Sequence, residues 1–163
     1  MAAPFEYRQA EEIAEAFSRR GVRYLFLGKS GAILLGYPDT TQDADLFVEK
    51  SPGNGKALLA ALEDLGFPLA PDRRAEIERC KDFVQIRDGP FDLDLVFAPD
   101  GIETFAEADR RGITVEGMRV CHIDDILRSK EAAGRRKDIE SLPRLRAFAA
   151  WWKGRPGGDH SSP

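Results

Sequence analysis

Aspartates occur in pairs within two short hydrophobic segments of this chain. Asp43 and Asp45 stand in the first segment, and Asp92 and Asp94 stand in the second. Residues i and i+2 of a β-strand project from the same face, so each pair is expected to place two carboxylates side by side. If the two strands are neighbours, three or four carboxylates converge, which suits a hard divalent cation such as Mg²⁺.

A carboxylate-held metal site of this kind is suited to in-line displacement at phosphorus. The alternative is that each aspartate lies on the solvent face of an amphipathic strand. A single pair would support either interpretation. Aspartate is disfavoured in strands, however, so two such pairs favour the metal site.

The segment Gly28-Lys29-Ser30-Gly31 is a second candidate for chemistry, because it joins a hydrophobic run to the start of a helix. Such a turn can bind phosphate through backbone N–H groups and the hydroxyl of Ser30. The Gly-Lys-Ser triplet does not make a P-loop, since that motif requires glycine at position 23, which is Arg23.

The elements that must position these residues follow from periodicity and turn residues. Strands are expected over Val22–Leu27, Asp43–Glu49, Phe83–Arg87, Phe91–Phe97, Ile113–Val115 and Met118–His122. Helices are expected over Phe5–Arg20, Ala32–Leu35, Lys56–Leu65, Asp72–Cys80, Ile102–Arg110, Asp125–Ala133, Arg135–Leu142 and Pro143–Trp152. A loop is expected at 51–55, and Asp124 is a candidate N-cap. The sequence therefore predicts an α+β (or α/β) domain whose mixed sheet is flanked by helices.

Length and composition predict one domain over residues 1–153 and a disordered tail over 154–163. The chain has 163 residues, of which 42% are hydrophobic and 32% charged, a globular composition. Its apolar runs, such as Ala57–Leu62, are too short to cross a membrane. Cys80 and Cys121 form neither a disulfide framework nor a metal motif, and the start lacks a signal peptide, so we expect a reducing cytoplasm.

Charge is unevenly distributed. The net charge of −4 is not that of a general nucleic-acid-binding protein. Arg128–Arg155 nevertheless holds nine basic and three acidic residues. Such a stretch can be an anion-binding face or a solvated helix surface, and the sequence leaves both open. Trp151 and Trp152 likewise fit either a hydrophobic core or a base-stacking platform.

The order of these segments resembles the DNA-polymerase-β-like nucleotidyltransferase superfamily, and most closely its small bacterial AbiE-type (type IV toxin–antitoxin) members. Those proteins have a glycine/serine turn, then a strand with an Asp-x-Asp pair, then a later strand aspartate and a C-terminal Lys/Arg/Lys-Asp segment. The corresponding segments here are Gly28–Ser30, Leu35–Leu46, Leu93–Val96 and Ile126–Leu142. The resemblance spans about Gly21 to Leu145. Lys29 replaces the second turn glycine, and the arginine before Thr41 is missing.

The resemblance implies a nucleotidyltransferase fold with a C-terminal helical segment, and a role for each matching residue. Catalytic and metal-binding roles fall on Asp43, Asp45 and Asp94, which would hold Mg²⁺ or Mn²⁺. Nucleotide-binding roles fall on Gly28, Lys29, Ser30, Thr41, Lys130 and Asp138. Lys130 would neutralise charge on the triphosphate, and Asp138 would orient Lys130 or touch the base.

The implied activity is the transfer of a nucleoside monophosphate from an NTP, such as ATP, to an acceptor hydroxyl. The acceptor could be RNA, such as a tRNA end, or a protein. An antitoxin protein is the partner that the resemblance implies, and no membrane partner is expected. The alternative is a non-catalytic nucleotide-binding or partner-binding module of the same fold.

Overall fold

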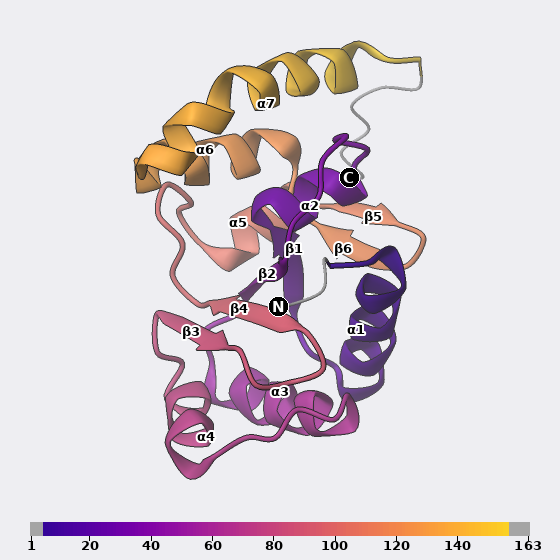
Figure 1. Cartoon of the computed structure of the whole chain (residues 1–163). Helices are drawn as coiled ribbons and strands as arrows, with labels where there is room; N and C mark the ends of the chain where they lie inside the picture. The colour runs from indigo at the N-terminus through magenta and orange to yellow at the C-terminus, as the bar shows by residue number, and fades with distance from the viewer. Residues whose placement is uncertain (1–4, 157–163) are drawn as a thin grey trace.

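Seven α-helices and six β-strands form the part of the chain that the computed structural model describes, residues 5–156 (Figure 1). The helices are α1 (Tyr7–Arg20), α2 (Gly28–Leu34), α3 (Pro52–Asp64), α4 (Pro71–Glu78), α5 (Phe105–Arg111), α6 (Ile123–Ala133) and α7 (Arg136–Gly154). The strands are β1 (Tyr24–Leu27), β2 (Asp43–Val48), β3 (Phe83–Ile86), β4 (Asp92–Val96), β5 (Ile113–Val115) and β6 (Met118–Val120). The expected mixed α+β class is confirmed. None of the described helices is long and apolar enough to cross a membrane.

The six strands form one open sheet in the order β3-β4-β2-β1-β6-β5. The hairpins β3–β4 and β5–β6 are antiparallel, as the turns at Asp88–Pro90 and Glu116-Gly117 predict. β1 pairs with β2 antiparallel, whereas β2 pairs with β4 and β1 pairs with β6 in parallel. The two strands that carry aspartate pairs are therefore direct neighbours.

Strand alternation divides the buried side chains into two cores, one on each face of the sheet. On one face Leu46 and Leu95 pack in a core that includes residues of α1, α3 and α4. On the other face Leu27 and Phe47 pack against α2, α5, α6 and α7. This second face is not fully covered, because Phe83 of β3 stays 44% exposed. An open area therefore remains over β3 and β4.

Two predicted boundaries next to the strands are wrong. The expected turn at Gly28–Gly31 is already helix, because the chain bends at Gly28 (φ 61°) directly from β1 into α2. The expected loop at 51–55 is the first turn of α3. The hydroxyl of Ser51 accepts a hydrogen bond from the N–H of Asn54, and Pro52 occupies the first helical position, where proline is favoured.

The C-terminal helices also differ from the prediction. The helices expected on either side of Pro143 form the single helix α7. A proline inside a helix costs about 3 kcal/mol, but a buried stripe from Leu142 to Trp152 continues across it and anchors both halves. The N-cap of α6 is His122 rather than Asp124, since Nδ1 of His122 accepts a hydrogen bond from the N–H of Asp124. The predicted tail is helical at its first residue, and its positions 157–163 lie outside the described residues.

Candidate active site

A cavity of about 460 Å³ lies over the open area of the sheet. Its walls come from the β1–α2 junction, from β2, β3 and β4, from the loop after β4, and from α6 and the start of α7. Eight of the nine predicted site residues line it, namely Gly28, Lys29, Thr41, Asp43, Asp45, Asp94, Lys130 and Asp138. The fold thus brings together residues that lie more than 100 positions apart in the sequence, from Gly28 to Asp138.

The carboxylates are aligned by the parallel pairing of β2 with β4. Asp45 lies opposite Asp94, and Asp43 lies opposite Asp92. Only three of these four line the cavity, since Asp92 does not. The convergence of carboxylates that the strand pattern predicts therefore takes place at Asp43, Asp45 and Asp94.

Ser30, the ninth predicted residue, is buried behind the cavity wall. Its hydroxyl donates to the carbonyl oxygen of Leu27 at 2.9 Å and accepts from the N–H of Asp45 at 3.0 Å. Ser30 thus ties the β1–α2 junction to the strand that carries the aspartates. Its hydroxyl is used for this contact and does not point into the cavity as a phosphate ligand.

Gly28 lies directly against Asp45. A Cβ atom on Gly28 would stand 2.1 Å from Oδ2 of Asp45, far inside contact distance. Only glycine leaves room for this carboxylate, and only glycine adopts the left-handed backbone of the junction at low cost. The glycine is therefore required by the aspartate beside it.

Arg87 is a member of the site that the sequence analysis missed. It follows β3 directly, and its Nη2 atom lies 2.8 Å from Oδ1 of Asp94 and 3.5 Å from Oδ2 of Asp43. The only sequence signal was an arginine at the mouth of a hairpin that leads into an aspartate-bearing strand. A guanidinium at this place neutralises part of the carboxylate cluster.

The negative charges of Asp45 and Asp94 are poorly compensated by the groups around them. Burial raises the pKa of Asp45 well above its usual value, and the negative charges of Asp94 and Asp43 raise it further. Oδ1 of Asp94 is buried and, despite the nearby Arg87, has no hydrogen-bond donor in suitable geometry, which is true of no other side-chain atom buried among residues 5–156. An added cation would relieve both the repulsion between Asp45 and Asp94 and the poorly aligned contact at Oδ1 of Asp94.

Basic side chains face these carboxylates from the helices. Lys29 at the start of α2 forms an ion pair with Asp39 at 3.4 Å. Lys130 on α6 lies 3.5 Å from Asp138, which also pairs with Arg135 at 2.7 Å. Burial alone would raise the pKa of Asp138, but the hydrogen bond from Arg135 and the charge of Lys130 outweigh it, so the pKa is lowered. Asp138 thus stays ionised and holds the two cations at the cavity wall.

The donor set fits a hard divalent cation, because all three candidate ligands are carboxylates and one oxygen is buried without a hydrogen bond. Asp43, Asp45 and Asp94 are the residues that would hold it. Among residues 5–156, however, no three acidic, histidine or cysteine side chains are already arranged as a metal site. Arg87 stands between two of the three ligands instead.

Other candidates from the sequence lie away from the cavity. Trp152 is buried against the ring of His122, while Trp151 is 61% exposed on α7, and neither lines the cavity. Arg144 and Arg146 also lie outside the cavity lining, in ion pairs with Asp39 and Glu131. The cavity receives only Lys130, Arg135 and Lys137 from the basic stretch.

Comparison with known proteins finds no family model and no curated protein that matches this chain.

Proposed function

We propose that the protein is a metal-dependent nucleotidyltransferase that moves a nucleoside monophosphate from an NTP to an acceptor hydroxyl. The observation that carries this proposal is one cavity with walls of opposite charge. Asp43, Asp45 and Asp94 line it from the sheet, and Lys29, Lys130, Arg135 and Lys137 line it from α2, α6 and the start of α7. Asp82, Asp100 and Asp138 also line it, and Asp138 pairs with Lys130 and Arg135. A triphosphate with bound Mg²⁺ needs both kinds of wall, since its anions require cations and its metal requires carboxylates.

Each wall supports one part of the reaction. Lys29 and Lys130 bind the anionic phosphates as point charges, and Asp138 keeps Lys130 directed at the cavity. The helix dipole contributes little, because α2 has only seven residues. A divalent cation, when bound by the three carboxylates, would neutralise charge that develops on the phosphate oxygens. The size of the cavity, about 460 Å³, is within the usual range for small-molecule sites.

The proposed reaction is a displacement at the α-phosphorus. The acceptor oxygen forms a bond to this phosphorus, the bond to the oxygen that bridges the α- and β-phosphates breaks, and pyrophosphate leaves. The proton of the acceptor hydroxyl passes to a carboxylate, and Asp94, which lines the cavity, is the candidate for this role. Pyrophosphate remains beside the basic side chains until it is released.

The first prediction uses two aspartates on the same strand. Asp94→Asn should abolish label transfer from an α-³²P-labelled NTP, because it removes a carboxylate from the cavity. Asp92→Asn is the matched control and should retain activity, since Asp92 points to the same face of β4 but does not line the cavity. Each labelled NTP is incubated with tRNA or cell lysate, with and without Mg²⁺. Equal transfer by Asp94→Asn, or no transfer from any NTP by the native protein, would contradict the proposal.

A non-catalytic nucleotide-binding module is the second candidate, and the position of Arg87 favours it. A guanidinium already pairs with Asp43 and Asp94, so a permanently occupied cluster would bind nucleotide without metal chemistry. Nucleotide binding that is unaffected by Mg²⁺, together with no label transfer, would support the module. A toxin–antitoxin role stays a prediction of the resemblance.

A further inference from the structure

We propose that Arg87 is the internal cation of the metal-free site, and that Arg87 and a divalent metal ion are alternative occupants of the same carboxylates. This inference rests on the proposed metal-dependent function and adds a residue that sets its metal affinity. Arg87 is thus a positioning residue, which acts through Asp43 and Asp94.

The position of the guanidinium is the first observation. Nη2 of Arg87 bridges one carboxylate on β4 and one on β2, at 2.8 Å from Asp94 and 3.5 Å from Asp43. Nη1 donates to the carbonyl oxygens of Leu93 and Ile86 at 3.3 Å and 3.4 Å, which are long contacts. Arg87 is therefore held mainly by the charge of the two carboxylates.

The second observation is the poor hydrogen-bond geometry between the guanidinium of Arg87 and Oδ1 of Asp94. Oδ1 of Asp94 is buried, and the guanidinium at 2.8 Å supplies charge without a well-directed hydrogen bond. A buried carboxylate oxygen that lacks a hydrogen bond gains from any ligand that coordinates it directly. The carboxylate is thus neutralised by Arg87 but remains available to a better-placed cation.

The freedom of Arg87 to leave is the third observation. Its side chain is 39% exposed, at the start of the β3–β4 loop, so a change of side-chain rotamer can carry the charge into solvent. The carboxylates belong to two paired central strands and cannot separate without breaking the sheet. When a metal ion enters, the arginine is the group that moves.

Competition between Arg87 and a metal ion for the same carboxylates links the folding stability of the protein to its metal affinity. If the metal-bound protein no longer uses the Arg87 contacts, removing Arg87 weakens only the metal-free state. The factor by which the folding equilibrium falls without metal must then equal the factor by which metal affinity rises. A purely structural arginine would instead lower stability in both states.

The test compares Arg87→Gln with Arg74→Gln, a matched control. Arg74 has a similar exposure of 40% and an ion pair of 2.8 Å, but its partner is Glu63 and not a carboxylate of the proposed metal site. Calorimetry measures Mn²⁺ alone binding to each protein, and Asp94→Asn shows whether the ion binds at this site. Denaturant titration measures folding stability in EDTA and at saturating Mn²⁺. Should Arg87→Gln fold poorly, Arg87→Lys keeps a charge and is expected to bind Mn²⁺ with intermediate affinity.

We expect Arg87→Gln to bind Mn²⁺ tighter by a factor on the order of ten, the size of a charge-assisted contact. It should be less stable than the native protein in EDTA and equally stable at saturating Mn²⁺, while Arg74→Gln keeps the native affinity. Equal or weaker Mn²⁺ binding by Arg87→Gln, or no binding by any variant, would overturn the inference. Tighter Mn²⁺ binding without any label transfer by the native protein would leave the inference intact and contradict the proposed function.

Discussion

The three aspartates proposed as metal ligands differ in what neutralises their negative charge. Asp43 and Asp94 share the guanidinium of Arg87. Asp45 has Gly28 on one side and Asp94 on the other, and its raised pKa shows that neighbouring cations do not compensate for burial and repulsion. An uncompensated negative charge at Asp45 therefore costs stability in the absence of a bound cation.

The second prediction concerns the pH dependence of stability. A carboxyl whose pKa is higher in the folded state binds its proton more tightly there, so it favours folding at low pH. This contribution is lost as pH rises from about 4, the usual carboxyl value, through the raised pKa of Asp45. Asp45→Asn should thus be more stable than the native protein at pH 7 in EDTA, and the advantage should disappear below about pH 4. Denaturant titrations at several pH values, with and without Mg²⁺, measure the difference.

The control for this prediction is Asp92→Asn, because Asp92 lies outside the cavity lining. It should show no comparable gain at pH 7. Saturating Mg²⁺ should reverse the order of the native protein and Asp45→Asn, since the metal ion then uses the negative charge. If Asp45→Asn is less stable than the native protein at pH 7 in EDTA, the carboxylate is stabilising and this account of the cluster is wrong.

At the scale of elements, the β1–α2 junction is what places Asp45. The chain turns at Gly28 in the left-handed region, and Ser30 in the first turn of α2 fixes the backbone of β2 by accepting the N–H of Asp45. The same residues that resembled a phosphate-binding turn therefore also build the carboxylate wall. Lys29, between them, is the member of this junction that reaches the cavity with a charge.

The third prediction separates backbone strain from crowding at this junction. Gly28→Ala introduces a Cβ 2.1 Å from a carboxylate oxygen and a residue with φ of 61°. Gly21→Ala introduces a similar φ of 69° but meets nothing within 4 Å. Each should lose about 1–2 kcal/mol of stability from the left-handed backbone. Only Gly28→Ala should lose more than this and also lose Mn²⁺ affinity, because Asp45 must move.

Unfolding titrations and Mn²⁺ calorimetry on the two alanine variants give both quantities. An equal loss of stability with unchanged Mn²⁺ affinity would show that Asp45 moves aside at no cost, and that Gly28 serves the backbone alone.

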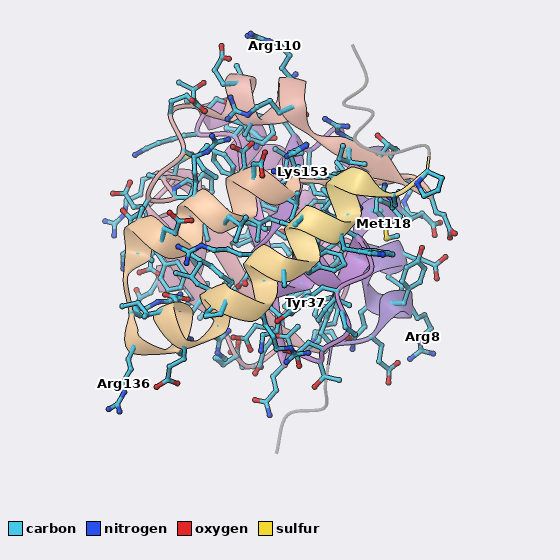
Figure 2. The ribbon with its side chains drawn as sticks, turned by 90° about the horizontal axis from the view of Figure 1, so that it is seen from above. Arg8, Tyr37, Arg110, Met118, Arg136 and Lys153 are labelled. Carbon is cyan, nitrogen blue, oxygen red and sulfur yellow. The ribbon has the colours of Figure 1, made fainter. Side chains whose placement is uncertain are left out.

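At the scale of the whole molecule, the basic segment Arg128–Arg155 lies on α6 and α7 (Figures 1 and 2). These two helices cover the same face of the sheet as α2 and α5. Arg136 projects from the start of α7 away from the molecule, as Figure 2 shows. Most cations of this segment pair with acidic groups, since Arg128, Arg136, Arg144, Arg146 and Lys153 contact Asp125, Glu140, Asp39, Glu131 and Asp124. The surface is thus less positive than the sequence suggests.

The fourth prediction follows for an RNA acceptor. Of the basic side chains in Arg128–Arg155, only Lys130, Arg135 and Lys137 line the cavity. Lys137→Ala should raise KM for a tRNA acceptor and leave KM for the NTP unchanged. Arg146→Ala, whose charge pairs with Glu131 outside the cavity, is the control and should change neither. With about two phosphates neutralised, log(kcat/KM) should fall against log[salt] with a slope of about −1 to −2.

Steady-state kinetics at several salt concentrations measure this slope. If transfer does not depend on salt and Lys137→Ala has no effect on either KM, RNA is the wrong acceptor class. A protein hydroxyl or a small molecule would then be the leading acceptor.

Patterns within the sequence were sufficient to predict most elements, because periodicity, turns and caps act over a few residues. The two hairpins, the strand containing Asp43 and Asp45, and the strand containing Asp94 lie within two residues of their predicted bounds. Local patterns predicted the wrong element where the same residue types occur both in loops and at or within helices. Ser51 and Pro52 look like a loop but start a helix, and Pro143 looks like a break but is spanned by buried packing.

Tertiary structure alone decided how the site is assembled. The pairing of β2 with β4 joins residues about fifty positions apart, and it determines which aspartate lines the cavity and which, Asp92, does not. The packing of α2 on β2 turned the Ser30 hydroxyl toward the N–H of Asp45, and the β3–β4 pairing brought Arg87 against Asp94. No local period encodes these contacts, because each depends on which strands become neighbours and on the space left between side chains. The residue types were therefore readable from the sequence, whereas their partners were set by the packing of the sheet.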